Sequence, residues 1–180
     1  MSAERKRASK SETLTIRLDQ KARFAIEFIA RLRGQNITTV IERAIRNEAD
    51  KERLGPQGER GWLDYWHVSE GIRFLQVAMD EDLHPTFEED EIVDFVRTHW
   101  QFFALNSHFS AFNQSYIDIL WPRIHEFVQH WRDNKAVDRW ATGKLMQDAL
   151  RAAKERPPEW PPQPPQPSSR KLQLDDDIPF

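Results

Sequence analysis

The chain has no cysteine among its 180 residues, which excludes disulfide bonds, a thiol nucleophile and any zinc or iron–sulfur site built on cysteine. It also lacks an apolar run long enough to cross a bilayer, and Met1–Lys10 is too polar for a secretory signal peptide. No glycine-rich phosphate-binding loop is present. We therefore expect a cytoplasmic protein that has no membrane partner.

Charge divides the chain into unlike parts. Residues 1–60 carry 14 Lys and Arg against 9 Asp and Glu, whereas residues 61–155 carry 9 against 16. Seven of the 11 prolines lie between Pro157 and Pro167. These shifts predict a basic head, an acidic body and a proline-rich tail.

The head begins with a short alternating pattern. Apolar and polar residues alternate from Thr13 to Leu18, which is typical of a strand with one buried face. Asp19 is a suitable N-cap for a helix over Gln20–Arg33, and Gly34 suits a left-handed C-cap. A broad apolar stripe marks this helix: Phe24, Ile26, Phe28, Ile29 and Leu32.

A second helix is expected to start at Asn36 or Thr38. Its predicted buried side consists of Val40, Ile41, Ala44 and Ile45. One strand and two helices cannot close a core alone, and a lone strand leaves both edges unpaired. We therefore expect a homodimer in which two strands pair antiparallel.

Residues Thr13–Asn47 resemble the ribbon-helix-helix family of DNA-binding proteins, of the Arc, MetJ and CopG type. The resemblance lies in the strand Leu14–Leu18, the Gly34 turn and the Ile37–Thr39 entry to the second helix. In that family the two-stranded ribbon enters the major groove of double-stranded DNA. The alternative is a strand and two helices of an unrelated α+β core, with its threonines facing water.

The ribbon-helix-helix resemblance implies three groups of DNA-binding residues. Base edges would be read by Thr13, Thr15 and Arg17. Backbone N–H groups at the second helix start would hold a phosphate, around Asn36, Ile37 and Thr38. The arm would add salt-dependent affinity through Arg5, Lys6, Arg7 and Lys10.

The acidic body shows helical periodicity throughout. Helices are predicted over Trp62–Met79, from a capping box at Thr86 onward, over Phe109–Trp131 with a break at Pro122, and over Ala136–Lys154. The six histidines lack metal-ligand spacing, and the acidic runs are typical of solvated helix faces. We expect an all-helical bundle of four or five helices, with no metal, no cofactor and no enzymatic activity.

The tail from Arg156 is too rich in proline for helix or central strand and predicts an extended, flexible tether. The six residues after the tether combine acid and apolar groups: Asp175, Asp176, Asp177, Ile178, Pro179 and Phe180. Such a segment suits docking, because the apolar side chains fill a pocket while the carboxylates pair with a basic rim. The alternative is an acidic terminus that only promotes solubility.

The segment Asp175–Phe180 closely resembles the acidic tip of bacterial single-stranded-DNA-binding proteins. In that family the tip recruits genome-maintenance proteins such as exonuclease I, helicases and polymerase-holoenzyme subunits. The resemblance implies the same partners here. The rest of the chain does not resemble that family.

Together these patterns predict a mainly α protein with one strand per chain. Its parts are a basic arm (1–12), a ribbon-helix-helix domain (13–54), a helical domain (61–155), a proline-rich linker (156–174) and a docking tip (175–180). The leading hypothesis is a homodimeric DNA-binding adaptor, of plasmid or phage type, that recruits or competes for host replication and repair proteins. The alternative is a transcriptional repressor or antitoxin-like autoregulator whose helical domain binds a protein partner.

Overall fold

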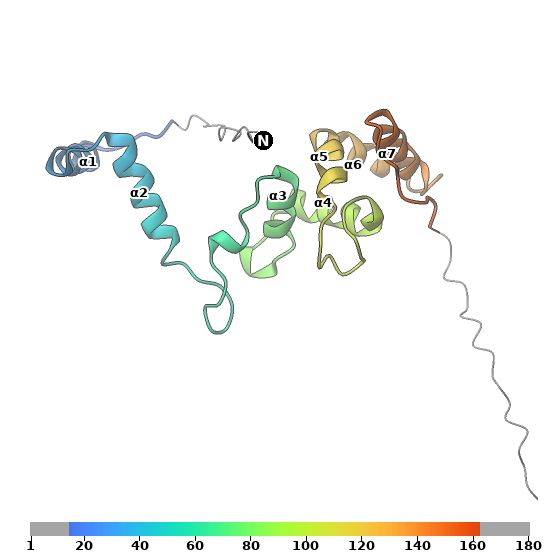
Figure 1. Cartoon of the computed structure of the whole chain (residues 1–180), viewed down its shortest axis with the longest axis horizontal. Helices are drawn as coiled ribbons and strands as arrows, with labels where there is room; N and C mark the ends of the chain where they lie inside the picture. The colour runs from blue at the N-terminus through green and yellow to red at the C-terminus, as the bar shows by residue number, and fades with distance from the viewer. Residues whose placement is uncertain (1–14, 163–180) are drawn as a thin grey trace, which may run out of the picture. The chain divides into compact units, whose positions relative to one another are not determined.

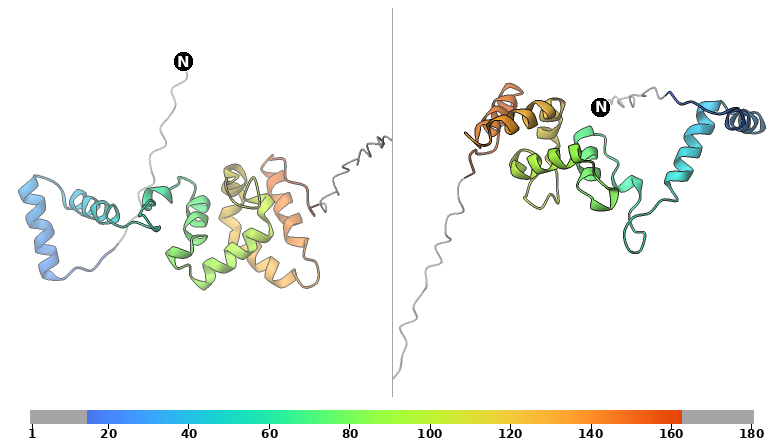
Figure 2. Two further views of the ribbon diagram at one scale, coloured as in Figure 1. Left: turned by 90° about the horizontal axis from the view of Figure 1, so that it is seen from below. Right: turned by 180° about the vertical axis from the view of Figure 1, so that it is seen from behind.

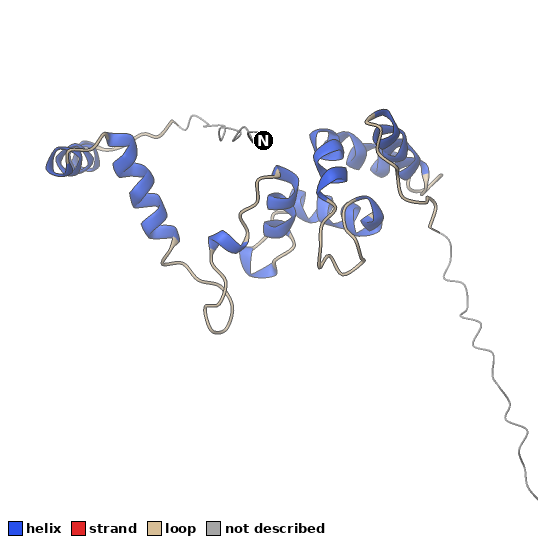
Figure 3. Ribbon diagram, in the orientation of Figure 1, coloured by secondary structure: helices blue, strands red, loops and turns tan. Residues whose placement is uncertain are grey.

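The computed structural model of the chain describes residues 15–162, which divide into two compact units between Trp62 and Leu63. We call residues 15–62 the head and residues 63–162 the helical unit. Both units are helical, and no strand forms within 15–162, so the expectation of a mainly α protein is confirmed (Figure 1, Figure 3). Among the described helices, none combines the length and the apolar composition needed to span a membrane.

The head consists of two helices, α1 (Gln20–Arg33) and α2 (Ile37–Ala49), joined by a tight turn (Figure 2). Asp19 caps α1 as predicted, because its Oδ1 accepts a hydrogen bond of 2.7 Å from the Ala22 backbone N–H. Gly34 ends α1 with φ 61°, a left-handed conformation that favours glycine because a Cβ would crowd the backbone there.

The strand predicted over residues 13–18 does not form in the described part of that segment. Residues 15–19 have no strand partner within 15–162. The physical reason is that a strand exists only through ladder hydrogen bonds to a second strand, and the single chain supplies none. Pairing between two copies therefore stays a prediction.

The last residues of the head close a short loop. Leu54 and Arg60 exchange backbone hydrogen bonds of 2.8 and 3.2 Å around Gly55–Gly58. The Trp62 indole N–H donates a 2.8 Å hydrogen bond to Asp50 Oδ1. The head therefore extends to Trp62, beyond the boundary at residue 54 that the sequence indicated.

The helical unit contains the five remaining α-helices of the described chain. These are α3 (Glu70–Ala78), α4 (Phe87–Thr98), α5 (Gln114–Leu120), α6 (Ile124–Asn134) and α7 (Ala141–Ala152). Short 3₁₀ turns lie between them or before them: η1 (Trp62–Asp64), η2 (Glu81–Leu83), η3 (Trp100–Phe102) and η4 (Trp121–Arg123). Two predicted features are confirmed, the capping box at Thr86 and the break at Pro122.

Three predicted helices are shorter than their apolar periodicity indicated. The helix predicted over Phe109–Trp131 begins only at Gln114, where the Asn113 side chain caps α5. The helix predicted over Trp62–Met79 begins only at Glu70, after the N-cap Ser69. The last helix begins at Ala141 because Asp138 Oδ1 accepts a hydrogen bond of 2.9 Å from the Trp140 N–H and so forms a turn instead. Side-chain hydrogen bonds to the backbone of this kind compete with helix formation.

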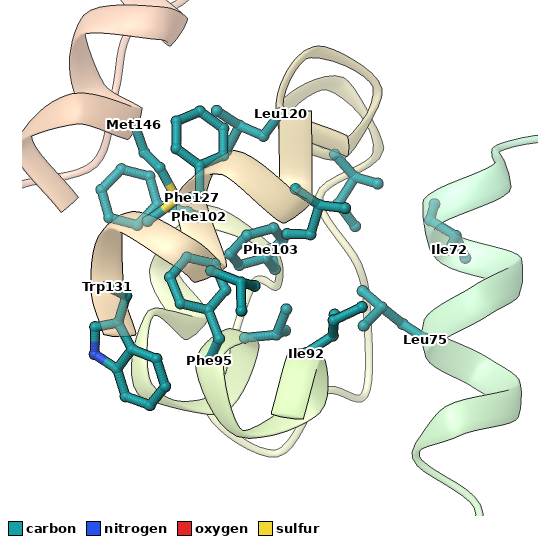
Figure 4. Packing of buried hydrophobic residues seen from close by; sticks show 14 of the residues in the cluster. Ile72, Leu75, Ile92, Phe95, Phe102, Phe103, Leu120, Phe127, Trp131 and Met146 are labelled. Carbon is teal, nitrogen blue, oxygen red and sulfur yellow. The ribbon is translucent and has the colours of Figure 1, made fainter. Parts of the chain in front are cut away.

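The core of the helical unit is aromatic and draws on every α-helix of that unit. Phe95, Phe102, Phe103 and Phe127 are fully buried among aliphatic side chains (Figure 4). Close approach of α3 to α5 requires Gly71, because a Cβ there would lie 2.6 Å from both Ile117 Cγ2 and Trp121 Cδ2. Gly71 thus permits tight packing of α3 against α5.

The first residues of the predicted linker belong to the helical unit. The carbonyl oxygens of Arg156 and Pro158 accept hydrogen bonds from Tyr116 Oη and Gln147 Nε2. Trp160 inserts its ring above α7, where it donates a 2.9 Å hydrogen bond from Nε1 to the Trp140 carbonyl. The helical unit therefore extends beyond the boundary predicted at residue 155. Hydrogen bonds to two backbone carbonyls and the packing of Trp160 attach this proline-rich segment to the helices.

Gly143 makes room for this anchor, since a Cβ at that position would overlap the Trp160 ring. The ring also stacks on His99, with centroids 5.1 Å apart and an interplanar angle of 26°. His99 is fully buried, and its Nδ1 lies 2.9 Å from the Phe95 carbonyl. Burial lowers the pKa of His99 to about 4, against the ordinary 6.5, so its ring is neutral at pH 7.

The buried His99 makes the stability of the helical unit depend on pH. The folded protein keeps this ring neutral while the unfolded chain takes up a proton, so stability is lost as pH falls from 6.5 towards about 4. Between pH 7 and pH 5 we expect the unfolding free energy to decrease by about 2 kcal/mol from this group. Urea unfolding followed by tryptophan fluorescence measures the change.

Two variants isolate the contribution of His99. His99→Phe removes the titrating group and should flatten the pH dependence, whereas His108→Gln changes an exposed histidine and should leave the dependence as in the wild type. Equal pH dependence in His99→Phe and wild-type protein would contradict the assignment.

Candidate nucleic-acid interface

The extended segment before α1 has two unlike sides. Ile16 and Leu18 line a groove together with Ile26 and Ile37, and the charged pair Arg23 and Glu27 completes its lining. Thr15 and Arg17, two of the predicted base-contacting residues, are exposed and do not line this groove. The alternation seen in the sequence therefore corresponds to an apolar side facing the helices and a polar side facing solvent.

Arg17 is available for a ligand. It has no ion-pair partner among residues 15–162, unlike Arg23, which lies 3.1 Å from Glu27. A guanidinium group with free donors can form two parallel hydrogen bonds to the edge of guanine. Two of the three residues that the sequence assigns to base contacts, Thr15 and Arg17, thus lie together on an open face.

The N-terminus of α2 presents backbone donors beside the groove, whose lining includes Ile37. Asn36 caps the helix, since its Oδ1 accepts a 2.7 Å hydrogen bond from the Thr39 N–H and its carbonyl accepts from Val40 at 3.2 Å. The first four N–H groups of a helix lack intrahelical partners, so those of Ile37 and Thr38 remain open. Asn36, one of the three predicted phosphate-binding positions, therefore uses its side chain to cap α2.

The positive end of the α2 dipole favours an anion near these N–H groups. α2 carries no acidic residue in its first turn, so nothing on that turn opposes an anion. Ile37 also lines the groove, which places the helix start beside Ile16 and Leu18, on the apolar side of the extended segment.

The head leaves most of its large apolar side chains in solvent. Ala30 and Val40 are its only hydrophobic residues in the buried class among 15–62. Ile16 is 49% exposed, Leu18 45% and Ile45 58%. Ala44 and Ile45, predicted to be buried, are therefore exposed, because a two-helix unit offers their side of α2 nothing to pack against.

The apolar stripe of the first helix has two unlike parts. Phe24, Phe28 and Leu32 are exposed, whereas Ile26 and Ile29 are partly buried. The sequence indicated this division, because the five apolar residues cover more of the helix circumference than a single stripe that packs against one partner.

Part of the predicted interface lies outside the described residues. This holds for the arm residues Arg5, Lys6, Arg7 and Lys10, for Thr13, and for the tip residues Asp175, Asp176, Asp177, Ile178, Pro179 and Phe180. Their roles stay predictions.

The acidic run at the start of α4 has structural uses in the helical unit. Glu89 closes the capping box, and the hydrogen bond from the Thr86 N–H lowers the pKa of this carboxyl. Glu91 pairs with Arg132 of α6, whose Nε lies 2.9 Å from Glu91 Oε1. Within residues 15–162 no group of three or more acidic or histidine side chains is placed to hold a metal ion.

A groove of the helical unit was not foreseen from the sequence. It lies between α3, α4 and α6, with an apolar floor of Phe74, Ile92 and Val128. Its rim includes Glu88 and Arg132. Periodicity places the floor residues on their helices but does not show that the three helices leave a gap.

No family model, no curated protein and no solved structure matches this chain.

Proposed function

We propose that this chain is a homodimeric, sequence-specific DNA-binding adaptor that brings replication and repair proteins to a DNA site through its C-terminal tip. The observation that carries the proposal is the two-sided segment before α1. Its apolar side chains Ile16 and Leu18 face the helices, while Thr15 and Arg17 face outward. A second copy of the same segment completes a two-stranded ribbon.

Dimerisation follows from the exposed apolar surface of the head. Burying apolar surface is worth about 25 cal/mol per Å², so half-exposed Ile16 and Leu18 favour a partner that covers them. An antiparallel second strand also satisfies the backbone groups that residues 15–19 leave unpaired. The paired ribbon carries two copies of each outward residue, as a two-fold symmetric DNA site requires.

DNA recognition in this proposal divides between base contacts and phosphate contacts. Arg17 and Thr15 enter the major groove, where Arg17 pairs with guanine. The open N–H groups of Ile37 and Thr38 hold a phosphate and so fix the register of the ribbon. The arm residues Arg5–Lys10 add affinity that depends on salt and carries little sequence information.

The segment Asp175–Phe180 supplies the second half of the adaptor. Its likeness to the tip of bacterial single-stranded-DNA-binding proteins supports the same class of partners, which includes exonuclease I, helicases and polymerase-holoenzyme subunits. A dimer presents two such tips at one DNA site, which raises their effective concentration for a shared partner. The helical unit holds the chain up to Trp160, so the tether to the tip starts from a folded anchor.

The groove of the helical unit favours a second candidate function. Its apolar floor and Glu88 on the rim suit a protein partner, as in a transcriptional autoregulator or antitoxin-like repressor. The two functions differ in the location of the DNA site. A footprint confined to the promoter of the chain's own gene favours the repressor, whereas a footprint at a replication or transfer origin favours the adaptor.

The base-reading role of Arg17 is tested by Arg17→Ala. We expect specific DNA affinity to fall by about 1–3 kcal/mol, with relaxed preference at one base pair in each half-site. Arg46→Ala is the matched control, because Arg46 lies in the last turn of α2 and pairs with Glu42. Fluorescence anisotropy with specific and scrambled duplexes measures both. Unchanged specific affinity in Arg17→Ala would show that the ribbon assignment is wrong.

The phosphate contact at α2 is tested by a pair of substitutions that both preserve the cap. Asp and Ser are N-caps about as good as Asn, so Asn36→Asp and Asn36→Ser should leave helix content unchanged. Only Asn36→Asp places a negative charge beside the proposed phosphate, and we expect it to weaken DNA binding about tenfold. Equal DNA affinities of the two variants would rule out a phosphate at this position.

The docking role of the tip is tested with the purified full chain and exonuclease I. Deleting Phe180 removes the terminal aromatic group, and we expect binding to fall at least about tenfold, because such an anchor carries much of the energy of a short peptide. Leu172→Ala, an apolar change outside Asp175–Phe180, should bind as the wild type does. The docking proposal fails if the Phe180 deletion binds as tightly as the full chain.

A further inference from the structure

The groove of the helical unit combines an apolar floor with an acidic rim. Ile92 and Val128 form the floor together with Phe74, which is only partly buried. The groove has a volume of about 480 Å³, within the range of about 300–1,000 Å³ that is typical of ligand sites. The carboxylates that line it all belong to α4: Glu88, Glu89 and Glu91.

One of these carboxylates has no partner in the part of the chain that the structure describes. Glu89 accepts a hydrogen bond of 2.7 Å from the Thr86 N–H. Glu91 pairs with Arg132, whose Nε lies 2.9 Å from Glu91 Oε1. Glu88 is exposed and makes neither a hydrogen bond nor an ion pair with a described residue. The groove therefore suits an occupant that brings one cation and several apolar groups.

The C-terminal tail contains a segment of this composition just before the tip. Residues Arg170–Leu174 read Arg-Lys-Leu-Gln-Leu. Side chains of an extended segment alternate between its two sides, so extended binding would place Arg170, Leu172 and Leu174 on one side. The two leucines then match the apolar floor, and the guanidinium group of Arg170 matches the carboxylate of Glu88.

The tail is long enough to bring this segment to the groove of its own chain. The ring of Trp160 stacks on His99, the C-cap residue of α4. Glu88 lies eleven residues before His99, which is about 17 Å along a helix. The ten residues from Pro162 to Leu172 span up to about 31 Å at about 3.1 Å per residue. The segment therefore reaches the groove from its anchor on the same unit.

Two other charged segments of the chain match the groove less well. The arm residues Arg5–Lys10 are basic, but Ala8 is their only apolar residue, so they would leave the floor uncovered. The tip Asp175–Phe180 is apolar at its end, but its aspartates would meet the unpaired charge of Glu88. Charge and apolar content together favour Arg170–Leu174 and keep the tip outside.

We propose that Arg170–Leu174 docks in the groove of the helical unit of its own chain. Its two leucines cover the apolar floor, and Arg170 pairs with Glu88. This contact goes beyond the proposed function and does not depend on it. The tip Asp175–Phe180 then projects from the edge of the groove and stays open to its own partner, whereas a protein partner that binds the groove has to displace the docked segment.

Hydrogen exchange of the full chain, measured by mass spectrometry at short labelling times, tests the contact. Glu88→Arg should speed exchange of the amides of residues 172–174 at least about threefold, because the opposite charge pair becomes a like pair. Asp90→Arg is the matched control, since Asp90 is an exposed carboxylate of the same helical turn that does not line the groove. Equal exchange in Glu88→Arg and wild-type protein would overturn the proposal.

A charge exchange distinguishes docking within one chain from docking between copies. Arg170→Glu alone should speed exchange as Glu88→Arg does, and the double variant should recover the slow exchange of the wild type. The two single variants mixed in equal parts should both stay fast, because neither has a matching pair in its own chain. Fast exchange in the double variant would overturn the charge pair, and recovery in the mixture would overturn docking within one chain.

Binding of exonuclease I tests whether the tip lies outside the groove. Leu172→Ala removes one of the two docked leucine side chains and should speed exchange of the amides of Gln173 and Leu174. The same variant should bind exonuclease I as the wild type does, because the tip is open in both. Tighter binding by Leu172→Ala than by the wild type would show that the groove holds the tip, and would overturn the proposed placement.

Discussion

The head cannot cover its own apolar side chains, and the rest of the account depends on this constraint. Two helices and one extended segment bury only Ala30 and Val40 of their hydrophobic residues, while Ile16, Leu18 and Ile45 stay about half exposed. A unit of this size has too little interior to stabilise itself. A second copy is the simplest source of the missing surface, because it also provides the strand that residues 15–19 lack. Dimerisation then places the outward side chains Thr15 and Arg17 in symmetric pairs, the arrangement from which the DNA-binding proposal follows.

The helical unit, in contrast, buries its apolar side chains within one chain. Its aromatic core involves α3 to α7, and its last element is the segment around Trp160 rather than a helix. Trp160 covers the neutral ring of His99, and Gly143 leaves space for the indole. The acidic residues of this unit complete a cap at Glu89 and an ion pair at Glu91. In the proposed DNA-binding role, DNA phosphates would repel this acidic unit and favour contact through the head.

Local features of the fold could be predicted from the sequence, because they depend on a few neighbouring residues. Asp19, Gly34 and the Thr86 capping box define helix ends through their own side chains or conformations, and each lies where predicted. The helix start at Ala141 could not be predicted, since it follows a turn held by the hydrogen bond from the Trp140 N–H to Asp138, which no periodicity encodes. The proline-rich composition around Trp160 indicated only that no helix forms there. The packing of the Trp160 ring beside Gly143 could not be predicted, because it depends on how the helices of the unit are arranged.

The candidate site, too, could be predicted from the sequence only in part. Ile16 and Leu18 line a groove with residues of both helices and Arg17 does not, as the alternation indicated, but the face predicted to be buried stays about half exposed. The sequence showed that apolar residues cover more than one side of α1, but it did not show which of these sides the chain itself covers. An apolar side chain in a helix does not reveal whether its partner lies in the same chain.

The absence of cysteine from the natural chain permits a direct test of the ribbon. In an antiparallel pair centred on Leu14–Leu18, Ile16 lies opposite its own copy, within reach of a disulfide bond. The full chain with the single substitution Ile16→Cys should form a covalent dimer under mild oxidation, whereas Leu105→Cys, at an exposed position of the helical unit, should not. Non-reducing electrophoresis measures the cross-linked fraction. A largely dimeric Ile16→Cys protein agrees with the account, and an Ile16→Cys protein that stays as uncross-linked as Leu105→Cys contradicts it.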